Sequence, residues 1–315
     1  MPLKQEHQSQ SLNQHNSSVS MITVLDHLGV LVFSDQDAQK FLHSQLTCDV
    51  AGLSKDHATP GGYLTAKGRL LCTFMLWRMG DEFMMQLPKS LLEPVMAHFK
   101  KFVLRDKVGI RNASDEISCY GLIKAEPLLA KDFCFPSVNH TLCSFKNISI
   151  LRLTHERVEI IGNQVTTKDI QPVMDNMLKV GSNIWRKMDI ERGWPVILPE
   201  TQGLFVPQMV NLEKSGGISF KKGCYPGQEI VARMQYRGTP GRIMYRISAV
   251  EGIAKPGDPV MKHDSQIGHV VNAEPEALGY TALAVLPVDT RISGLKINDK
   301  YINTLKIIDE FTLQD

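Results

Sequence analysis

Cysteine is scarce in this sequence, and its spacing excludes several kinds of site. The 315 residues contain six cysteines, and no two of them form a Cys-x-x-Cys pair: Cys48, Cys72, Cys119, Cys134, Cys143 and Cys224. Zinc sites, redox dithiols and iron–sulfur clusters need closer and more regular spacings, and disulfide frameworks belong to smaller secreted chains. We therefore expect no metal site and no permanent cluster, in a protein of the reducing cytoplasm.

Long apolar runs and a strong net charge are also missing. No stretch approaches the roughly 20 apolar residues that cross a bilayer, so we expect no membrane association. The N-terminus has no basic segment followed by an apolar core, so we expect no secretory signal. Residues 1–20 are rich in Gln, Ser, Asn and His, which predicts a disordered tail. The net charge of +2 does not predict direct nucleic-acid binding.

The hydrophobic pattern of the remaining chain predicts both strands and helices, as in an α+β fold. Strands are expected as a pair over 21–33 with a turn near 27–29, and then over 60–66, 69–79, 82–87, 107–112, 117–123 and 147–161. Helices are expected over 36–46 (capped by Asp35), 89–102 and 168–179, followed by a shorter helix that Ser182 or Asn183 caps and that ends at Gly193. Short apolar runs after Gly241 predict a small antiparallel barrel: 243–250, 258–262, 266–273, 279–286 and 301–308.

The segment Lys222–Glu229, which reads Lys-Gly-Cys-Tyr-Pro-Gly-Gln-Glu, carries the clearest chemical signal. Pro226 suits the first position of a helix, and residues 230–234 continue with an apolar stripe at helical spacing. Cys224 is then expected just ahead of a helix N-terminus and beside two lysines, which favours the thiolate. We therefore take Cys224 as a candidate catalytic thiol. The alternative from the residues alone is a small packed hydrophobic side chain.

Positive charge is concentrated around this segment. Between residues 221 and 246, six Lys and Arg residues face Glu229 as the single acid. This excess favours an anionic ligand, with Lys222 and Arg233 as candidate binding residues. The alternative is a solvated helix face on which Glu229 and Arg233 form an ordinary i,i+4 pair.

The octapeptide and its continuation Ile230-Val231-Ala232-Arg233 resemble the signature of the folate-binding YgfZ family. Other segments follow in the family's order: a helix leading into Thr47-Cys48-Asp49-Val50, the hairpin Ala66-Lys67-Gly68-Arg69, and the stretch 205–220. This family is similar in fold to the aminomethyltransferase (T-protein) of the glycine cleavage system. The resemblance implies a ring of three units around tetrahydrofolate or a one-carbon derivative of it. Two interleaved α+β units would occupy 21–240, and a C-terminal β-barrel would occupy 241–315.

The resemblance also implies a folate site. A pterin ring fits a flat aromatic face and a carboxylate, and the family's Trp and the Glu of its Glu-x-Gly motif match Trp185 and Glu191. From the residues alone, a Trp at helical spacing such as Trp185 more often belongs to the core, and Glu191 could belong to a solvated helix end. A second Trp that the family often has falls at Leu28. One stacking partner is therefore missing, so we expect weaker binding or an altered pose.

Two functions are open at this point. The resemblance implies a folate-binding accessory protein that supports iron–sulfur assembly and iron–sulfur enzymes, including tRNA-modifying methylthiotransferases, with Cys224 as the working thiol. The alternative is a folate-dependent one-carbon transferase or demethylase for aminomethyl or N-methyl groups, with Cys224 or Glu229 in catalysis. The related aminomethyltransferases carry an Asp pair where this sequence has Cys72 and Thr73, neither of which is a carboxylate. We therefore do not expect aminomethyl transfer.

Overall fold

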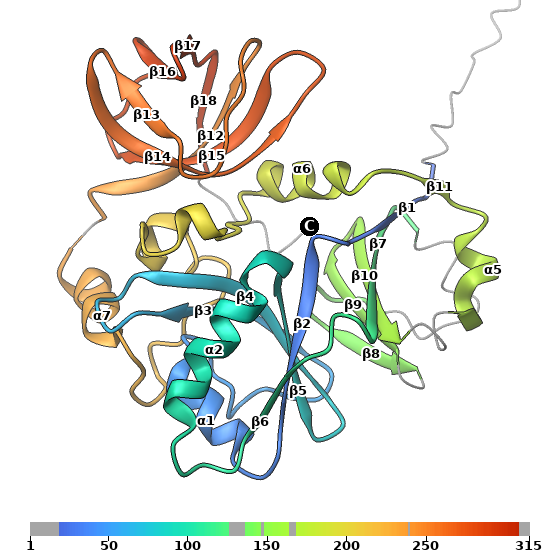
Figure 1. Cartoon of the computed structure of the whole chain (residues 1–315). Helices are drawn as coiled ribbons and strands as arrows, with labels where there is room; N and C mark the ends of the chain where they lie inside the picture. The colour runs from blue at the N-terminus through green and yellow to red at the C-terminus, as the bar shows by residue number, and fades with distance from the viewer. Residues whose placement is uncertain (1–18, 126–135, 146–147, 164–167, 239, 309–315) are drawn as a thin grey trace, which may run out of the picture.

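Three β-sheets surround a central helix, α6 (Ser182–Arg192), as Figure 1 shows. The computed structural model describes residues 19–125, 136–145, 148–163, 168–238 and 240–308. The expected α+β fold is confirmed, with a C-terminal antiparallel sheet that curves into a half-barrel. Most of the predicted tail over 1–20 lies outside the described residues.

A five-stranded antiparallel sheet in the order β3-β4-β5-β2-β6 forms the first unit. Its strands are β2 (Leu28–Ser34), β3 (Ala58–Leu64), β4 (Leu70–Met79), β5 (Glu82–Pro88) and β6 (Gly109–Asn112). Helices α1 (Ala38–Gln45) and α2 (Leu92–Val103), the latter preceded by the short turn η1 (Lys89–Leu91), share a core with one face of the sheet. Along β2, residues 31 and 33 pack in that core and residues 30 and 32 in a second core. Burial on both faces explains the unbroken apolar run.

A six-stranded sheet in the order β11-β1-β7-β10-β9-β8 forms the second unit. Its strands are β1 (Met21–Val24), β7 (Ile117–Ile123), β8 (Leu142–Phe145), β9 (Ile148–Thr154), β10 (Arg157–Asn163) and β11 (Leu178–Lys179). The second core lies between this sheet and the five-stranded one, so the two units share buried side chains.

Several sequence expectations for this region are wrong. The predicted strand pair over 21–33 does not exist, because β1 pairs with β7 and β11 whereas β2 pairs with β5 and β6. The strand expected over 147–161 is the β9–β10 hairpin, and β8 was not predicted. The helix expected over 168–179 is reduced to η2 (Lys168–Ile170) and α5 (Gln171–Met174) before β11.

Two predicted helix caps are also wrong. Helix α1 begins at Ala38 with Asp37 as its N-cap, and Asp35 instead adopts a positive φ of 74° in the turn before it. Helix α6 has Gly181 as its N-cap rather than Ser182 or Asn183. Its predicted end is confirmed, because Gly193 takes the left-handed conformation (φ 73°) that closes a helix.

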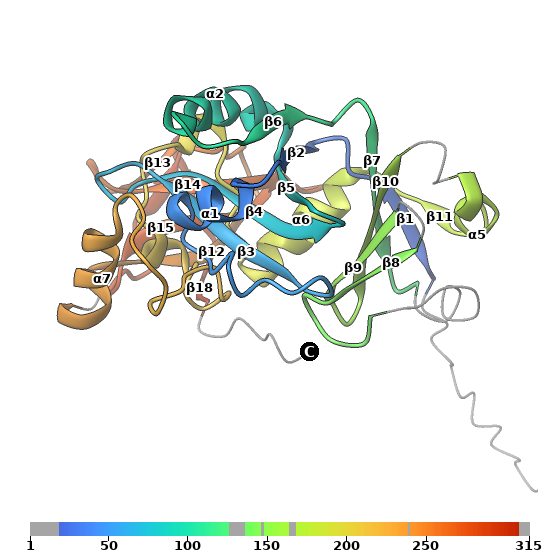
Figure 2. The same ribbon diagram turned by 90° about the horizontal axis from the view of Figure 1, so that it is seen from below.

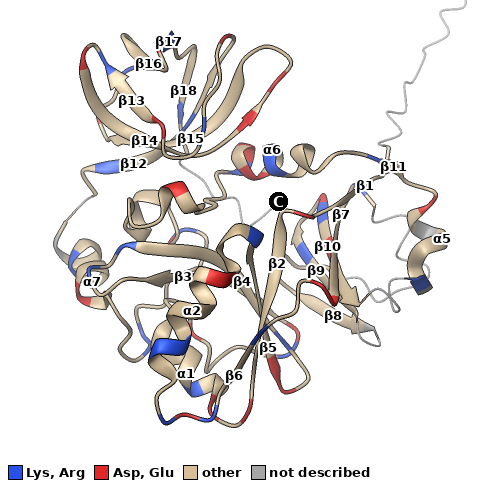
Figure 3. Ribbon diagram, in the orientation of Figure 1, with Lys and Arg blue, Asp and Glu red and all other residues tan. Residues whose placement is uncertain are grey.

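The C-terminal sheet has the order β17-β16-β13-β14-β15-β12-β18 and a core of its own. Its strands are β12 (Arg242–Ala249), β13 (Pro259–Lys262), β14 (Ser265–Pro275), β15 (Tyr280–Pro287), β16 (Leu295–Ile297), β17 (Lys300–Tyr301) and β18 (Thr304–Ile307). All seven strands follow residue 241, which suits the predicted boundary, although the division into units at 240 stays a prediction. Figure 3 shows acidic and basic residues scattered over helices, turns and strand ends, whereas most of the drawn ribbon is neither acidic nor basic.

The segment between α6 and the C-terminal sheet is irregular, as predicted. It contains the short turns η3 (Pro199–Thr201) and η4 (Pro207–Val210) and then helix α7 (Gln228–Arg237). In both views α7 lies at the edge of the molecule and away from α6 (Figures 1 and 2).

Candidate functional site

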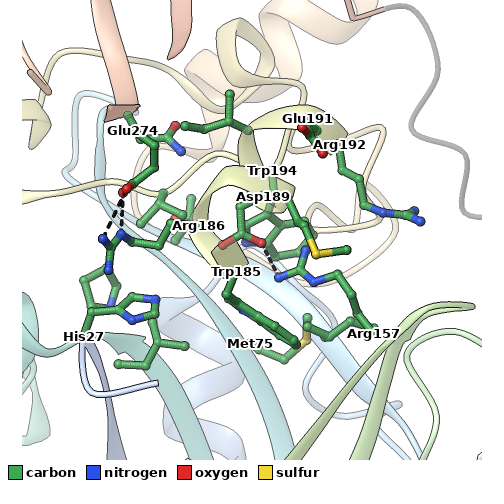
Figure 4. A pocket seen from close by; sticks show the side chains of 18 of the residues that line it. His27, Met75, Arg157, Trp185, Arg186, Asp189, Glu191, Arg192, Trp194 and Glu274 are labelled. Carbon is green, nitrogen blue, oxygen red and sulfur yellow. Dashed lines mark hydrogen bonds and ion pairs between the residues drawn. The ribbon is translucent and has the colours of Figure 1, made fainter. Parts of the chain in front are cut away.

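A cavity of about 820 Å³ lies around α6, where the three sheets meet. Its wall combines α6 with the β1–β2 turn, β4, β5, the β9–β10 hairpin, β14 and the residues around β18. This volume is within the range of small-molecule sites, about 300–1,000 Å³. The lining includes aromatic, carboxylate and cationic side chains, and Figure 4 shows part of it.

Trp185 of α6 forms part of this wall, but both faces of its ring are covered. The Arg157 guanidinium carbon lies 3.9 Å from the centre of the indole ring. On the β7 side, a Cβ added at Gly121 would lie 2.5 Å from the ring, so the strand backbone packs against it. Only 1% of Trp185 is exposed. A ligand ring that stacked on Trp185 would therefore have to displace Arg157.

Two ion pairs hold α6 in the wall, one buried and one partly buried. Arg157 donates from Nη2 to Asp189 Oδ1 at 2.7 Å, and Arg186 pairs with Glu274 of β14 (Figure 4). Burial raises the pKa of Asp189, and the neighbouring Arg157 opposes that rise. These pairs connect the helix to the six-stranded sheet on one side and to the C-terminal sheet on the other.

Glu159 of β10 is a second buried carboxyl group in the lining. Gln86 donates from Nε2 to Glu159 Oε2 at 2.8 Å. Burial raises the pKa of Glu159 to about 7, although the Gln86 hydrogen bond and the charge of Arg157 both oppose the rise. A carboxyl group with this pKa is about half protonated at neutral pH and can donate as well as accept a hydrogen bond.

Two histidines of the lining are held neutral. Burial, with the nearby charge of Arg186 as the next cause, lowers the pKa of His27 to about 4. Burial also lowers the pKa of His140. Sequence reasoning missed both histidines as well as Glu159, because they stand in turns and strands without a recognisable motif.

The predicted site residues fall into two separate groups. Trp185, Glu191 and Leu28 all line the cavity. Glu191 is exposed at the end of α6, and its backbone carbonyl accepts a hydrogen bond from Arg246 Nη1 at 2.6 Å. Cys224, Lys222 and Arg233 do not line the cavity, and the roles expected for them stay predictions.

The octapeptide forms its own structure before α7. Cys224 is exposed, as a reactive thiol must be. The expectation for Pro226 is wrong, because α7 begins only at Gln228 and Gly227 is its N-cap. Gly227 has a φ of 80°, and a Cβ there would lie 2.6 Å from Gly68 Cα. The two segments that resemble the family therefore touch backbone to backbone.

Lys222 and Arg233 have different surroundings within this region. The Lys222 ammonium donates to the carbonyl oxygens of His43 and Leu46, the latter at 2.6 Å, and thereby caps the C-terminal end of α1. Burial lowers the pKa of Lys222 to about 8. Arg233 is exposed on α7. Their predicted contact with a folate stays a prediction.

Thr73, at the position expected to differ from the aminomethyltransferases, has a structural role. Its hydroxyl donates to Pro195 O at 2.8 Å and accepts from the backbone N–H of Ile197 at 3.2 Å. Cys72 is buried, and burial raises its pKa to about 12. Neither side chain supplies a carboxylate or a ready base to the cavity.

The arrangement of three units around a cavity defines a class of fold. The glycine cleavage system aminomethyltransferase T from Bartonella henselae aligns with a TM-score of 0.71 over 94% of this chain and 87% of that chain. The two chains are 14% identical, so this likeness shows the fold alone. It confirms the expected aminomethyltransferase-type architecture.

Sequence relatives define the particular family. The tRNA-modifying protein YgfZ of Vibrio vulnificus (strain YJ016) is 32% identical over 280 residues, which are 85% of this chain and 84% of the relative. The tRNA-modifying protein YgfZ of Escherichia coli O157:H7 is 32% identical over 233 residues, 72% and 71% of the two chains. A scan of family models gave no match. The chain belongs to the YgfZ family, as the octapeptide predicted.

A helix that crosses a membrane must be both long and apolar. Among the described residues, no helix combines the length and apolar character needed to cross one.

Proposed function

We propose that this protein binds tetrahydrofolate, or a one-carbon derivative of it, in the cavity around α6 and acts as an accessory protein in tRNA modification. The cavity carries this proposal, because it has the volume of a ligand site and contains the three residues that match the family's folate positions. The name of the relatives supports the part in tRNA modification. The shared fold with an aminomethyltransferase supports the folate.

The lining suits the two ends of a folate. A pterin ring presents donors and acceptors along its edge, which fit the carboxyl groups of Glu191 and Glu159. Trp185 and Leu28 supply apolar wall. The glutamate tail of a folate carries carboxylates, and the exposed Lys89 and Lys306 of the lining offer the matching charge. The tail would then lie toward solvent and the pterin toward α6.

Cys224 is proposed as the thiol that serves the partner proteins. Its exposure makes it accessible to another macromolecule, and the surrounding chain is held by the Gly68–Gly227 contact and by Lys222. Iron–sulfur tRNA-modifying enzymes, or the machinery that assembles their clusters, are the proposed partners. The protein would act in the cytoplasm.

Two experiments test the folate and the thiol separately. Isothermal titration with tetrahydrofolate should give saturable one-site binding. In cells that lack the chromosomal copy, wild-type protein should restore tRNA methylthiolation, whereas Cys224→Ser should be folded and inactive. Cys143→Ser, in β8, is the matched control and should restore it. Absence of folate binding would refute the first part, and full restoration by Cys224→Ser would remove the thiol from the function.

The alternative function, one-carbon transfer, has less support. A transferase should consume tetrahydrofolate in the presence of an aminomethyl or N-methyl donor, whereas an accessory protein should bind it unchanged. Thr73 uses its hydroxyl in two backbone hydrogen bonds, so it offers no base for such a reaction. Turnover with any of these donors would favour the transferase.

A further inference from the structure

The two tryptophans of the cavity wall differ in what they present to a ligand. Trp185 is only 1% exposed, and Arg157 and the β7 backbone at Gly121 both pack against its ring. Trp194 also lines the cavity, but it is only half-buried and lies at the edge of the core that encloses Trp185. Figure 4 labels both in the pocket. Of these two rings, Trp194 has more surface left for a ligand.

The backbone on either side of Trp194 is fixed. Gly193 closes α6 in the left-handed conformation, and the backbone N–H of Trp194 donates to the backbone carbonyl oxygen of Asp189 at 2.8 Å. Pro195 follows and restricts the backbone of the residue before it to extended conformations. Thr73 then binds the next residues through Pro195 O and the Ile197 N–H. The indole is therefore presented from a rigid segment, and a rigid aromatic surface loses little entropy when it binds a ligand.

The surroundings of Trp194 suit a flat, uncharged ring. His140 lies edge-on to the indole, with ring centres 6.4 Å apart at an angle of 69°, and its lowered pKa keeps the imidazole neutral. Val196 and Leu198, which follow on the same segment, add apolar side chains to the lining. An aromatic ligand ring can stack on such a surface.

We infer that Trp194 is the aromatic surface on which the flat ring of the cavity's ligand lies, and that the buried Trp185 supports the wall behind it. The inference rests on the proposed function for the identity of the ligand, a conjugated ring with an anionic tail. The assignment of Trp194 as the surface on which that ring stacks comes from this structure alone.

The test compares the affinity of Trp194 variants for tetrahydrofolate by isothermal titration. Trp194→Leu keeps an apolar side chain but removes the ring, and it should weaken binding about tenfold. Trp194→Phe keeps a ring and should stay within about threefold of wild type. Trp77→Phe, a buried tryptophan of β4 outside the lining of this cavity, is the control and should bind as wild type. Wild-type affinity in Trp194→Leu would overturn the inference.

A measurement on the unaltered protein avoids any question of folding. Hydroxyl-radical footprinting read by mass spectrometry should show Trp194 oxidised in the free protein and protected when the ligand is bound. Trp185 should be unreactive in both states. Equal oxidation of Trp194 with and without ligand would contradict the assignment.

A second probe separates this inference from the proposed function. If wild-type protein does not bind tetrahydrofolate, the proposed function fails. The same variants are then compared with 8-anilinonaphthalene-1-sulfonate, an aromatic anion with a flat naphthalene ring. Weaker binding of this probe to Trp194→Leu would support the role of Trp194, whereas equal binding, or no binding to wild type, would overturn it.

Discussion

Glu159→Gln should make the protein more stable at alkaline pH. The wild-type carboxyl is buried in the cavity wall, and burial holds its pKa at about 7, against 4.5 for the ordinary side chain. Gln has nearly the same shape, and its carbonyl oxygen can accept the hydrogen bond that Gln86 donates. The substitution therefore removes the ionisation while it keeps the packing.

Proton linkage gives the direction and the size of this change in the free energy of unfolding. Between the two pKa values the folded protein holds a proton that the unfolded chain releases, so the free energy of unfolding falls as the pH rises through this window. A difference between 4.5 and about 7 corresponds to about 3 kcal/mol once the pH exceeds the higher value. Wild type should therefore lose most of this amount between about pH 5 and pH 8, and Glu159→Gln should not.

Urea unfolding of both proteins at a series of pH values measures this difference directly. The gap in free energy of unfolding should be below 1 kcal/mol near pH 5 and approach about 3 kcal/mol near pH 8. Glu116→Gln, which removes an exposed carboxylate paired with Arg111, is the control for the loss of one charge. A constant gap for Glu159→Gln across the series would show that Glu159 ionises normally in the folded state.

Three further substitutions test the hydrogen bonds and backbone contacts around the cavity and around the segment Lys222–Glu229. Thr73→Val removes both hydrogen bonds to the segment after Trp194 and should destabilise the protein by about 1–3 kcal/mol in urea unfolding, with recovery in Thr73→Ser. Lys222→Met leaves carbonyls at the end of α1 without their donor and should also lower the free energy of unfolding by about 1–3 kcal/mol; an unchanged value would mean that the cap is dispensable. Gly227→Ala forces a Cβ against Gly68 and should lower the free energy of unfolding by about 2 kcal/mol or more, which a lower melting temperature would report. An unchanged melting temperature would contradict the close approach of the two backbones.

Much of the fold was predictable because its elements have strong local signals. The β3–β4 hairpin around Gly68, the strands after Gly241 and the end of α6 at Gly193 all follow from apolar periodicity and turn residues. Strand pairing was not predictable in the same way. β1 and β2 are adjacent in sequence, yet they join different sheets, because pairing depends on contacts between distant segments.

The lining of the cavity was predictable only where it coincides with the family's motifs. Trp185, Glu191 and Leu28 were matched by resemblance and do line the cavity. His27, Glu159 and Trp194 were missed, because what distinguishes them is partial exposure to the cavity or a burial-induced pKa shift. Neither property can be read from the sequence, because both arise only when the three sheets fold together around the cavity.

The separation of the cavity from Cys224 bears on the choice between the two functions. A transferase holds the donor carbon and the acceptor in one pocket, because reacting atoms must approach to about 3–3.5 Å. Here the candidate folate residues line one cavity, whereas Cys224 is exposed on a loop outside its lining. A reaction within a single closed pocket could not use both. A partner protein that meets the exposed thiol, while a folate in the cavity braces α6 between the sheets, makes use of both regions, and this arrangement favours the accessory function.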